Sequence, residues 1–333
     1  MPGKVLVTGV SGFIGSHCAA DLLRAGYAVR GSIRDLSRSE AIRSALDRQG
    51  VDTTALEFCA ATLSDWECWQ PAAEGCDAIF HVASPVPTIQ PRNADDVVLP
   101  ARDGTLNVLA AARAQGINRV VLTSSVAAIM GSIADDRVYT AADWSDTDDP
   151  RLTPYALSKT VAERAAWDFC ETAGIGLTTV NPALVLGPAM ETDYGSSLEA
   201  VVKLMKREVP FLPRFGFEIV DVRDVAALHR LALENDAAVG QRLIAANGFR
   251  WFREIAAVLH EQYPEIGIPL KEMPNWLTHL VGLFVREIGS FIDDLDRVKR
   301  LDNAPAMDLG WAPSSPEDAI LAAAASLQRL GIA

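Results

Sequence analysis

The segment from Lys4 to Ala25 constrains the fold of this 333-residue chain more than any other part of it. A short apolar run, Lys4 to Thr8, predicts a buried strand. Apolar residues at helical spacing between Ser16 and Ala25 predict a helix. Three glycines stand between the two elements, in the sequence Gly9-Val-Ser-Gly12-Phe-Ile-Gly15. A strand, a glycine-rich turn and a helix therefore follow one another at the start of the chain.

Glycines in this context let the backbone turn sharply and approach a pyrophosphate, while the helix N-terminus offers N–H groups. An ordinary tight turn is the alternative, and the flanking strand and helix favour the nucleotide site. The spacing Gly-x-x-Gly-x-x-Gly differs from the Gly-x-Gly-x-x-Gly of the commoner dehydrogenases. We expect a dinucleotide to be bound here by Gly9, Ser11, Gly12, Phe13, Ile14 and Gly15.

Strands and helices alternate along the first half of the chain. Apolar runs predict strands, and helical spacing predicts helices, as far as residue 180. Alternation implies parallel strands joined by right-handed crossovers, so the predicted fold is α/β with a Rossmann-type doubly wound parallel sheet. Beyond Gly187, prolines break the pattern and predict a smaller, partly interleaved C-terminal substrate lobe. We assign 1–185 mainly to the dinucleotide-binding domain, with returning segments near 219–227 and 242–246, and 186–333 mainly to the substrate lobe.

Composition excludes several classes of protein. Acidic residues outnumber basic ones by 43 to 30, and the net charge of −13 disfavours binding to nucleic acid, which needs a basic face. Apolar runs are too short for a membrane span or a secretory signal, so we expect no membrane contact and a cytoplasmic location. The five cysteines have no metal-ligand spacing, and we expect reduced, mostly buried thiols and no metal.

Two further motifs carry hydroxyl groups suited to proton transfer. Tyr155 and Lys159 lie four residues apart, on one face of a predicted helix. A tyrosine has a pKa of about 10, and a neighbouring cation favours its charged form. Thr123, Ser124 and Ser125 follow a buried strand at its carboxyl end, where open α/β sheets bind ligands. These serines could merely satisfy backbone groups; beside the tyrosine and lysine, Ser125 is chosen over Ser124 as the hydroxyl that contacts a substrate.

These motifs resemble those of extended short-chain dehydrogenases/reductases, together with Phe80-His-Val-Ala-Ser84, Asn181-Pro-Ala-Leu-Val-Leu-Gly-Pro188 and Leu309-Gly-Trp311. The nearest group is the one containing dihydroflavonol reductases, cinnamoyl-CoA reductases and yeast-type aldehyde and ketone reductases. The resemblance implies that Tyr155 is the general acid, that Lys159 lowers its pKa and binds the nicotinamide ribose, and that Ser125 orients the substrate oxygen. Reduction of a carbonyl creates an alkoxide, which needs a proton and polarising donors.

The resemblance also implies further cofactor contacts. They are expected from Thr62, Leu63, Val82, Ala83, Ser84, Thr123, Tyr155, Lys159, Pro182 and Val185. Thr62 stands where the family often has an aspartate that bonds the adenine amine, so adenine recognition is expected to be weaker or to use the backbone. His81 is expected to be packed rather than catalytic.

The residues after the second predicted strand select the dinucleotide. NAD selection needs a carboxylate on the ribose diol, and NADP selection needs a cation on the 2′-phosphate. Arg34 can grip a phosphate with two donors, whereas Asp35 is a competing signal for the diol. The family pattern favours NADPH, with NADH as the alternative.

The substrate pocket is expected to be apolar and to suit an aryl or hydrophobic carbonyl compound. Its predicted lining is Val86, Pro87, Met190, Tyr194, Leu204 and Phe215. The stretch Thr153-Pro-Tyr-Ala-Leu-Ser-Lys159 lacks the signature Asn-Trp-Tyr-Cys-Tyr-Gly-Lys of cinnamoyl-CoA reductases, which disfavours a CoA thioester. The apolar helical stretch with Trp276, Leu280, Leu283, Phe284 and Phe291 is interpreted as core.

The leading hypothesis is an NADPH-dependent reductase of aldehydes or ketones, acting on a small molecule as a monomer or homodimer. A sugar-nucleotide epimerase or dehydratase that retains NAD shares the fold and the hydroxyl groups, and Arg34 argues against it. A non-catalytic dinucleotide sensor would be expected to lose Tyr155 or Lys159, and both are present.

Overall fold

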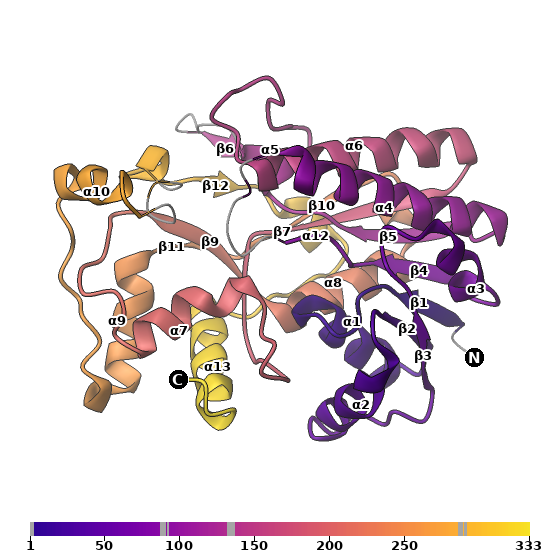
Figure 1. Ribbon diagram of the computed structural model, residues 1–333, viewed down its shortest axis with the longest axis horizontal. Helices are drawn as coiled ribbons and strands as arrows, with labels where there is room; N and C mark the ends of the chain where they lie inside the picture. The colour runs from indigo at the N-terminus through magenta and orange to yellow at the C-terminus, as the bar shows by residue number, and fades with distance from the viewer. Residues whose placement is uncertain (1–2, 87–90, 92, 132–136, 286–288, 290–291) are drawn as a thin grey trace.

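The computed structural model describes residues 3–86, 91, 93–131, 137–285, 289 and 292–333. A seven-stranded sheet with helices on both faces forms the larger part of the molecule, and a smaller lobe lies beside it (Figure 1). The N-terminus is at the sheet, and the C-terminus is at the end of a helix in the smaller lobe. The predicted α/β class and the parallel doubly wound sheet are confirmed.

The strands of the large sheet are all parallel to their neighbours. They are β1 (Lys4–Val7), β2 (Ala28–Ile33), β3 (Leu56–Ala60), β4 (Ala78–His81), β5 (Arg119–Thr123), β7 (Gly176–Pro182) and β10 (Arg242–Ala245). Their spatial order is β10-β7-β5-β4-β1-β2-β3. The chain builds outward from β1 in one direction and then from β4 in the other, so the two halves meet between β1 and β4. Ligands of open α/β sheets bind at such a switch point.

Helices cover both faces of this sheet. On one face lie α1 (Phe13–Arg24), α2 (Ser39–Asp47) and α8 (Val222–Glu234), and on the other α3 (Trp69–Ala73), α4 (Asp95–Ala114) and α6 (Pro154–Ala173) (Figure 1). Successive side chains of a strand point to opposite faces. Val5 and Val7 accordingly pack in the core under α1 and α8, while Leu6 packs in the core under α3, α4 and α6. Burial on both faces explains why these strands are continuous apolar runs in the sequence.

The smaller lobe is built on a mixed sheet of β8 (Leu184–Leu186), β9 (Gly216–Asp221) and β11 (Phe249–Trp251). Its core packs this sheet against α7 (Glu199–Met205), α9 (Phe252–Gln262) and α13 (Pro316–Arg329). Outside it lie α5 (Ala127–Met130), the strand pair β6 (Val138–Tyr139) and β12 (Arg300–Leu301), α10 (Asn275–Gly282) and α12 (Ala304–Asp308).

The two sheets are interleaved along the chain. The segment 219–227 contributes the end of β9 to the small sheet and the start of α8 to the large one, and 242–246 returns to the large sheet as β10. Asp221 begins α8 as a cap: its carboxylate accepts the Arg223 N–H at 2.8 Å and pairs with the Arg223 guanidinium at 2.6 Å. Asp221 and Arg223 therefore form a helix cap with an ion pair.

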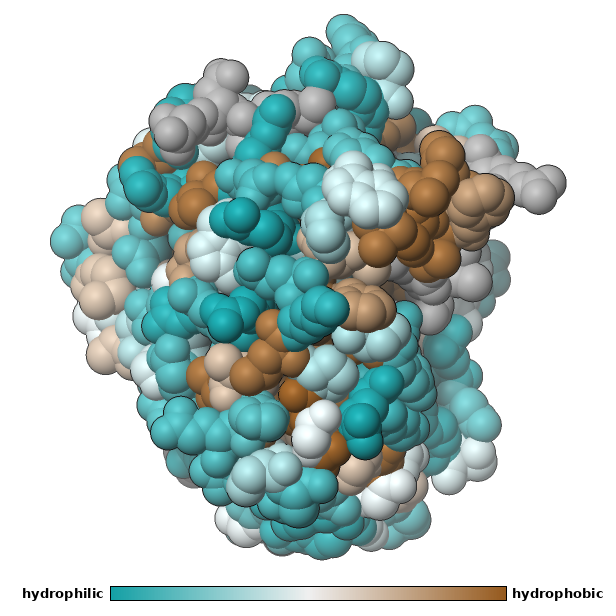
Figure 2. All heavy atoms as spheres, turned by 90° about the vertical axis from the view of Figure 1, so that its left-hand side faces the viewer, coloured by the Kyte–Doolittle hydropathy of each residue, from teal (hydrophilic) through white to brown (hydrophobic). Residues whose placement is uncertain are grey.

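One sequence interpretation is wrong. The apolar residues at α10 and just beyond it are exposed: Trp276 by 70%, Leu283 by 76% and Phe284 by 82%, with Leu280 also exposed. They are on the side of the molecule that Figure 2 turns toward the viewer, where hydrophobic atoms gather in the upper part. A helix can present an apolar stripe to a core or to its surroundings with the same spacing, so periodicity alone did not separate the two. Phe291 lies outside the described residues.

Candidate active site

The site lies where the carboxyl ends of β1, β4, β5 and β7 meet. The glycine loop follows β1, Val82 to Ser84 follow β4, and Ser124 and Ser125 follow β5. Tyr155 and Lys159 come from α6, which packs beside β7. Residues far apart in the sequence are thus gathered at the switch point of the sheet.

The glycine loop is shaped for close approach of a ligand. Gly9 has a φ of +67°, which favours glycine, and a Cβ on Gly15 would overlap the carbonyl oxygen of Gly9. A Cβ on Gly12 would meet only the Gly9 oxygen, at 3.3 Å, so the space above Gly12 is left open by the protein. Gly12 caps α1 without a side-chain hydrogen bond, and the first turn holds no acidic residue. These features fit the pyrophosphate of a dinucleotide.

Thr8, at the end of β1, holds the loop after β4 in place. Its hydroxyl oxygen accepts the N–H groups of Val82 and Ala83, each at 2.9 Å. The hydroxyl proton therefore goes to Nδ1 of His81, 2.9 Å away, and Nε2 of that ring donates to Thr105 at 3.3 Å. Burial, together with a smaller contribution from the Lys159 cation, lowers the pKa of His81 to about 3. His81 is thus neutral and packed, as expected from the sequence.

Tyr155, Lys159 and Ser125 meet beside this loop. A hydrogen bond joins the side chains of Ser125 and Tyr155. The Lys159 ammonium lies 6.0 Å from the centre of the Tyr155 ring and is buried. The Ser125 hydroxyl oxygen also accepts the Ala127 N–H at 3.1 Å, which fixes the serine rotamer.

Burial decides the ionisation of both α6 groups. It raises the pKa of the Tyr155 phenol, and the Ser125 hydrogen bond lowers it by less. Burial lowers the pKa of Lys159 by more than the nearby Glu163 carboxylate raises it, and the two effects together bring this pKa to about 8. The resemblance implied a lowered tyrosine pKa, whereas in this structure the pKa is raised, so the phenol holds its proton at neutral pH.

The two candidate serines are clearly separated. Ser124 donates its hydroxyl proton to Glu163 at 2.5 Å, away from Tyr155, so Ser125 is the serine beside the phenol. Thr123 also points away: its hydroxyl donates to Nε2 of His229 at 2.7 Å, because Nδ1 of that ring donates to the Val225 carbonyl. The threonine side chain is thus bound to α8.

Helix α6 positions the tyrosine and lysine through its cap. Thr153 accepts the Ala156 N–H at 3.2 Å, and Pro154 stands in the first turn, where its missing N–H costs nothing. Gly174, in the left-handed conformation, ends the helix. Tyr155 is therefore in the first turn and Lys159 one turn further on.

Three charged residues lie after β2. The Asp35 carboxylate accepts the Ser37 N–H at 2.9 Å and so caps the short helix η1 (Leu36–Arg38). Arg34 is exposed, and within the described ranges no hydrogen bond or ion pair engages its guanidinium. Arg38 pairs with Glu191 at 2.8 Å and with Asp193 at 3.5 Å. Arg34 thus has no partner in the described part of the chain, and the Asp35 carboxylate caps a helix, an arrangement that fits a 2′-phosphate better than a ribose diol.

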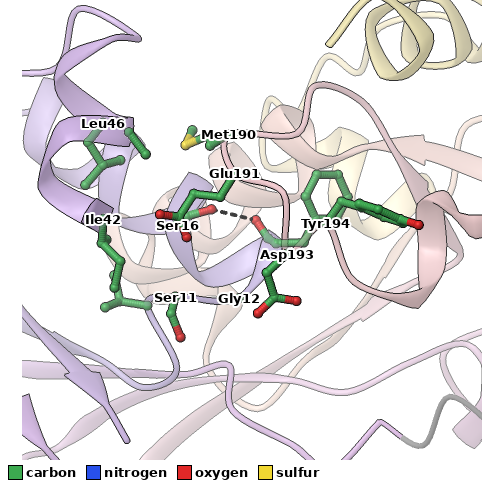
Figure 3. A pocket seen from close by; sticks show the side chains of 12 residues that line it. Ser11, Gly12, Ser16, Ile42, Leu46, Met190, Glu191, Asp193 and Tyr194 are labelled. Atoms are coloured by element: carbon green, nitrogen blue, oxygen red, sulfur yellow. Dashed lines mark hydrogen bonds between the residues drawn. The ribbon is translucent and has the colours of Figure 1, made fainter. Parts of the chain in front are cut away.

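A pocket opens between the glycine loop, α2 and residues 190–194 (Figure 3). Met190 and Tyr194, predicted to contact substrate, line it near Gly12. The Tyr194 hydroxyl points away from the pocket and donates to Glu199 at 2.9 Å. These two residues therefore lie beside the dinucleotide loop.

The other predicted substrate contacts are spread over the smaller lobe and the loop after β4. Leu204 is fully buried in the lobe core, and Phe215 packs there against Phe252 with ring centres 5.3 Å apart. Val86 is exposed, and Pro87 lies outside the described residues. The identity of the substrate contacts stays a prediction.

Of the remaining predicted cofactor residues, Thr62 and Leu63 follow β3, Pro182 ends β7 and Val185 lies within β8. Thr62 is exposed just after β3, and the Leu63 carbonyl accepts the Asn107 amide at 3.0 Å. Pro182 ends β7 and accepts the Val126 N–H at 3.0 Å, while Val185 is buried in β8.

Sequence reasoning missed three charged residues: Arg38, Glu163 and Arg242. Glu163 follows Lys159 by one turn of α6 and could have been found from i,i+4 spacing. Arg38 ends the short helix η1, and its partner Glu191 lies 153 residues away, so no helical spacing reveals it. Arg242 meets Glu163 at 2.6 Å from a position 79 residues away, which no local pattern reveals.

The described part of the chain holds no group of three or more His, Cys, Asp or Glu side chains arranged to bind a metal. No described helix is long and apolar enough to cross a membrane. The five cysteines are free thiols, and three of them are buried.

Comparison with known proteins places this site in a family. The model of the NAD dependent epimerase/dehydratase family matches residues 5–245. The chain is 36% identical to cinnamoyl-CoA reductase 1 of Arabidopsis thaliana over 80% of its length and 77% of that protein. It is 33% identical to dihydroflavonol 4-reductase of the same plant over 80% of its length and 71% of that protein.

A solved structure extends the likeness to the whole fold. Yeast methylglyoxal/isovaleraldehyde reductase Gre2, complexed with NADPH, superposes with a TM-score of 0.81 at 26% identity, covering 99% of this chain and 100% of that one. The chain belongs to the NAD dependent epimerase/dehydratase family, among the extended short-chain dehydrogenases/reductases, and is an NAD(P)-dependent oxidoreductase of the type of the dihydroflavonol, cinnamoyl-CoA and Gre2 reductases.

Proposed function

We propose that the protein uses NADPH to reduce aldehydes or ketones with aryl or hydrophobic substituents to alcohols. The observation that carries the proposal is the contact between Ser125 and Tyr155, with Lys159 buried one turn along α6 and the glycine loop at the same edge of the sheet. A carbonyl that is reduced to an alkoxide needs a proton and polarising donors, and two hydroxyl groups and one ammonium can supply them.

The side chains divide the work of the reaction. The reduced nicotinamide supplies the hydride. The Ser125 hydroxyl, held by the Ala127 N–H, orients the carbonyl oxygen, and Tyr155 gives its proton to that oxygen. Because burial raises the pKa of Tyr155, the phenol is protonated before the reaction and is suited to act as an acid. The Lys159 ammonium favours the charged form that the phenol takes after it gives up its proton, and it also binds the nicotinamide ribose.

The segment after β2 supports NADPH over NADH. Arg34 is exposed and unpaired among the described residues, while the Asp35 carboxylate is engaged by Ser37. An arginine can hold a 2′-phosphate with paired, charge-assisted hydrogen bonds. The relative Gre2, whose structure contains NADPH, supports the same choice.

The relatives support the substrate class. They are named for cinnamoyl-CoA, dihydroflavonol and methylglyoxal or isovaleraldehyde reduction, and all of these compounds carry a carbonyl group. The stretch 153–159 differs from the cinnamoyl-CoA reductase signature, so we place free aldehydes and ketones before CoA thioesters.

The test is a cofactor oxidation assay. Purified protein is mixed with NADPH or NADH and then with aryl aldehydes, β-keto esters, dihydroflavonols or cinnamoyl-CoA, and the absorbance of the reduced nicotinamide is followed. We expect loss of signal with NADPH and free carbonyl compounds. No loss with any compound, together with turnover of a UDP-sugar by protein that retains NAD, would replace the proposal by the epimerase hypothesis.

The oligomeric state of the protein can be measured on the same purified sample. We propose a monomer or a homodimer, and light scattering at the assay concentration distinguishes the two from larger oligomers.

A further inference from the structure

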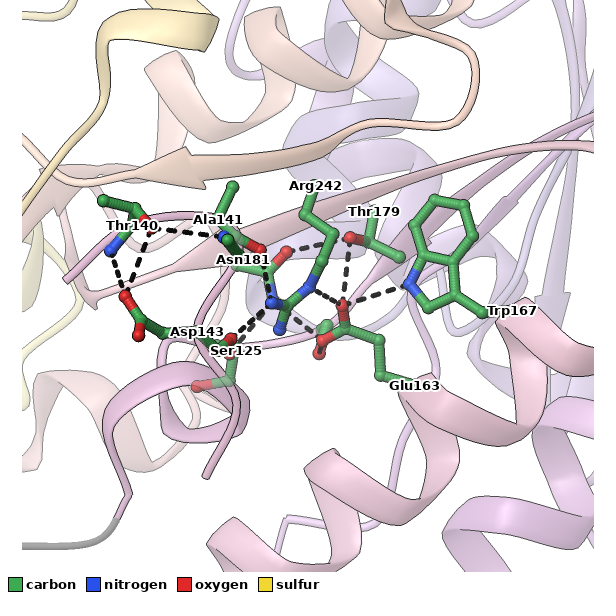
Figure 4. A network of polar contacts seen from close by, with 11 residues as sticks. Ser125, Thr140, Ala141, Asp143, Glu163, Trp167, Thr179, Asn181 and Arg242 are labelled. Carbon is green, nitrogen blue, oxygen red and sulfur yellow. Dashed lines mark hydrogen bonds and ion pairs between the residues drawn. The ribbon is translucent and has the colours of Figure 1, made fainter. Parts of the chain in front are cut away.

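A buried carboxylate behind the catalytic residues gathers donors from four parts of the fold. Glu163, on α6, has 1% of its surface exposed. Its oxygens accept hydrogen bonds from Arg242 at 2.6 Å, Ser124 at 2.5 Å and Asn181 at 2.8 Å (Figure 4). A weaker hydrogen bond comes from the Trp167 indole at 3.3 Å. The Thr179 hydroxyl oxygen lies 3.2 Å from the carboxylate, and its single proton is shared with the nearer Asn181 Oδ1, at 2.9 Å. A buried charge is tolerated when it is paired and hydrogen-bonded as fully as this one is.

Its cation is held just as firmly. Arg242, on β10, is 8% exposed and donates to the carbonyl oxygens of Ala141 at 2.6 Å and Asp143 at 2.5 Å. Its guanidinium carbon lies 3.7 Å from the centre of the Trp144 ring. One guanidinium nitrogen, Nη2, is buried and has no hydrogen-bond partner among the described residues. The arginine thus joins the last strand of the sheet to the segment that precedes α6.

The carboxylate is connected to the reacting groups by two routes, one through hydrogen bonds around Ser125 and the other through its charge. The hydrogen bonds involve Asn181 and Ser124. Asn181 donates to Glu163 and also to the backbone carbonyl of Ser125, at 3.2 Å. Ser124, the neighbour of Ser125, is bound directly to Glu163. The position of Ser125 at the end of β5 therefore depends on this carboxylate from both sides.

The second route is electrostatic and runs along α6. Tyr155, Lys159 and Glu163 follow one another at four-residue intervals, so they share a helix face. Glu163 raises the pKa of Lys159 against the lowering by burial. From β4, the facing titratable group is His81, which is neutral. The charged side chains of α4, which packs against α6, are exposed or half-exposed, and α5 carries none.

We propose that Glu163 and Arg242 are a positioning pair for the reductase site: the carboxylate fixes Ser125 through Ser124 and Asn181 and keeps Lys159 protonated, and Arg242 balances its charge. This inference rests on the proposed roles of Tyr155, Lys159 and Ser125. The inference adds two residues to those on which the reaction depends. Both act through Ser125 and Lys159 and not by contact with the substrate or the cofactor.

Variants of the two residues should have opposite effects, because the two charges shift the pKa values of Lys159 and Tyr155 in opposite directions. In Glu163→Gln, the Arg242 cation is left alone and lowers the pKa of both groups. In Arg242→Gln, the carboxylate is left alone and raises them, while Ser124, Asn181, Thr179 and Trp167 still contact it. We expect the alkaline limb of the kcat profile to move by about one pH unit to lower pH in the first variant and to higher pH in the second.

The experiment measures kcat and KM from pH 6 to pH 10 for wild type, both single variants and the double variant Glu163→Gln/Arg242→Gln. We expect kcat to fall in each single variant with the KM for NADPH nearly unchanged, and the limb of the double variant to return toward wild type. Arg242→Lys, which keeps the cation, should recover most of the kcat. Glu317→Gln, which breaks the exposed pair with Arg250 in the smaller lobe, is the matched control and should leave the profile unchanged.

A readout without turnover separates this inference from the proposed function. The ultraviolet signal of tyrosinate, taken as the difference between each protein and its Tyr155→Phe form, reports ionisation of Tyr155 directly. Midpoints that move in opposite directions support the positioning pair even if no carbonyl substrate is reduced. Midpoints and pH limbs that stay fixed, or that move in the same direction in both variants, overturn it. Should one single variant not fold, as circular dichroism would reveal, the other single variant decides by the direction in which its midpoint moves. A shift in the expected direction, with Arg242→Lys at the wild-type midpoint, supports the pair, and a midpoint that stays fixed or moves the other way overturns it.

Discussion

Arg38 reaches from the segment after β2 to Glu191 in the smaller lobe, with 2.8 Å between guanidinium nitrogen and carboxylate oxygen. Asp193 lies 3.5 Å from the same guanidinium. Both acids line the pocket beside the glycine loop, so two acidic groups compete for an arginine in the segment expected to bind the 2′-phosphate.

Removing one competitor is predicted to improve NADPH binding. In Glu191→Gln, the Arg38 cation loses its nearer acidic partner and becomes more available to the phosphate, and we expect the Kd for NADPH to fall about two- to fivefold, the effect of one ion pair that water still reaches. The Kd for NADH should not change. Titration of cofactor fluorescence measures both, and an equal change for the two cofactors would contradict the prediction.

Arg34 is predicted to select the cofactor. Arg34→Ser should raise the Kd for NADPH by about 10- to 100-fold, since hydrogen bonds to charged groups contribute about 1.5 to 3 kcal/mol, and leave NADH unaffected. Asp35→Asn is the matched control, because an asparagine can still cap η1. A loss of NADH activity in Asp35→Asn would identify the acid as the selector.

Tyr155→Phe is predicted to fold and to lose at least about 100-fold in kcat, the usual contribution of a general acid. NADPH binding should persist, because the Lys159 side chain and the glycine loop are unchanged. Tyr27→Phe, which removes a phenol whose one hydrogen bond among the described residues goes to Glu234, is the control for the substitution itself. Substantial reductase activity in Tyr155→Phe would show that another group donates the proton.

The glycine loop offers a pair of substitutions with different outcomes. Gly15→Ala places a methyl group on the Gly9 carbonyl oxygen and should destabilise the fold by about 1 to 3 kcal/mol. Gly12→Ala should unfold like wild type, because its methyl group meets only one protein atom, yet weaken NADPH binding by occupying the space of the pyrophosphate. Thermal unfolding and cofactor titration together separate the two effects.

Acid should destabilise the protein through its buried histidines. Burial lowers the pKa of His17 and of His229 to about 4 and that of His81 to about 3, from an ordinary value of 6.5. Each is neutral in the fold and is protonated first in the unfolded chain, so stability is full above pH 6.5 and falls as the pH drops toward 4.

Urea unfolding between pH 7 and pH 5 measures this effect. Each buried histidine adds at most about 1.4 kcal/mol per pH unit to the slope. His279→Asn, an exposed position, should leave the slope unchanged. A flat profile over this range would mean that these rings stay solvated.

The sequence predicts well what depends on local periodicity. The strands of the large sheet, the glycine turn and the shared face of Tyr155 and Lys159 follow from residue spacing alone. The choice between Ser124 and Ser125 needed the structure, because the direction of each side chain at a strand end depends on the path of the loop. The ring of donors around Glu163 joins α6, β5, β7 and β10, and no spacing rule connects residues that distant. The prediction that the apolar residues of α10 lie in the core was wrong for the opposite reason, because their local spacing is that of a core helix.

The interleaving of the two sheets limits how such a protein can be recombined. The chain passes from the large sheet to the small one after β7, returns with α8 and β10, and leaves again with β11. A chimaera made with one crossover near residue 185 would pair the β10 and α8 of one parent with the sheet of the other, and would replace Arg242 independently of Glu163. Transfer of a substrate lobe between relatives therefore requires several crossovers, placed so that both members of each buried pair come from the same parent.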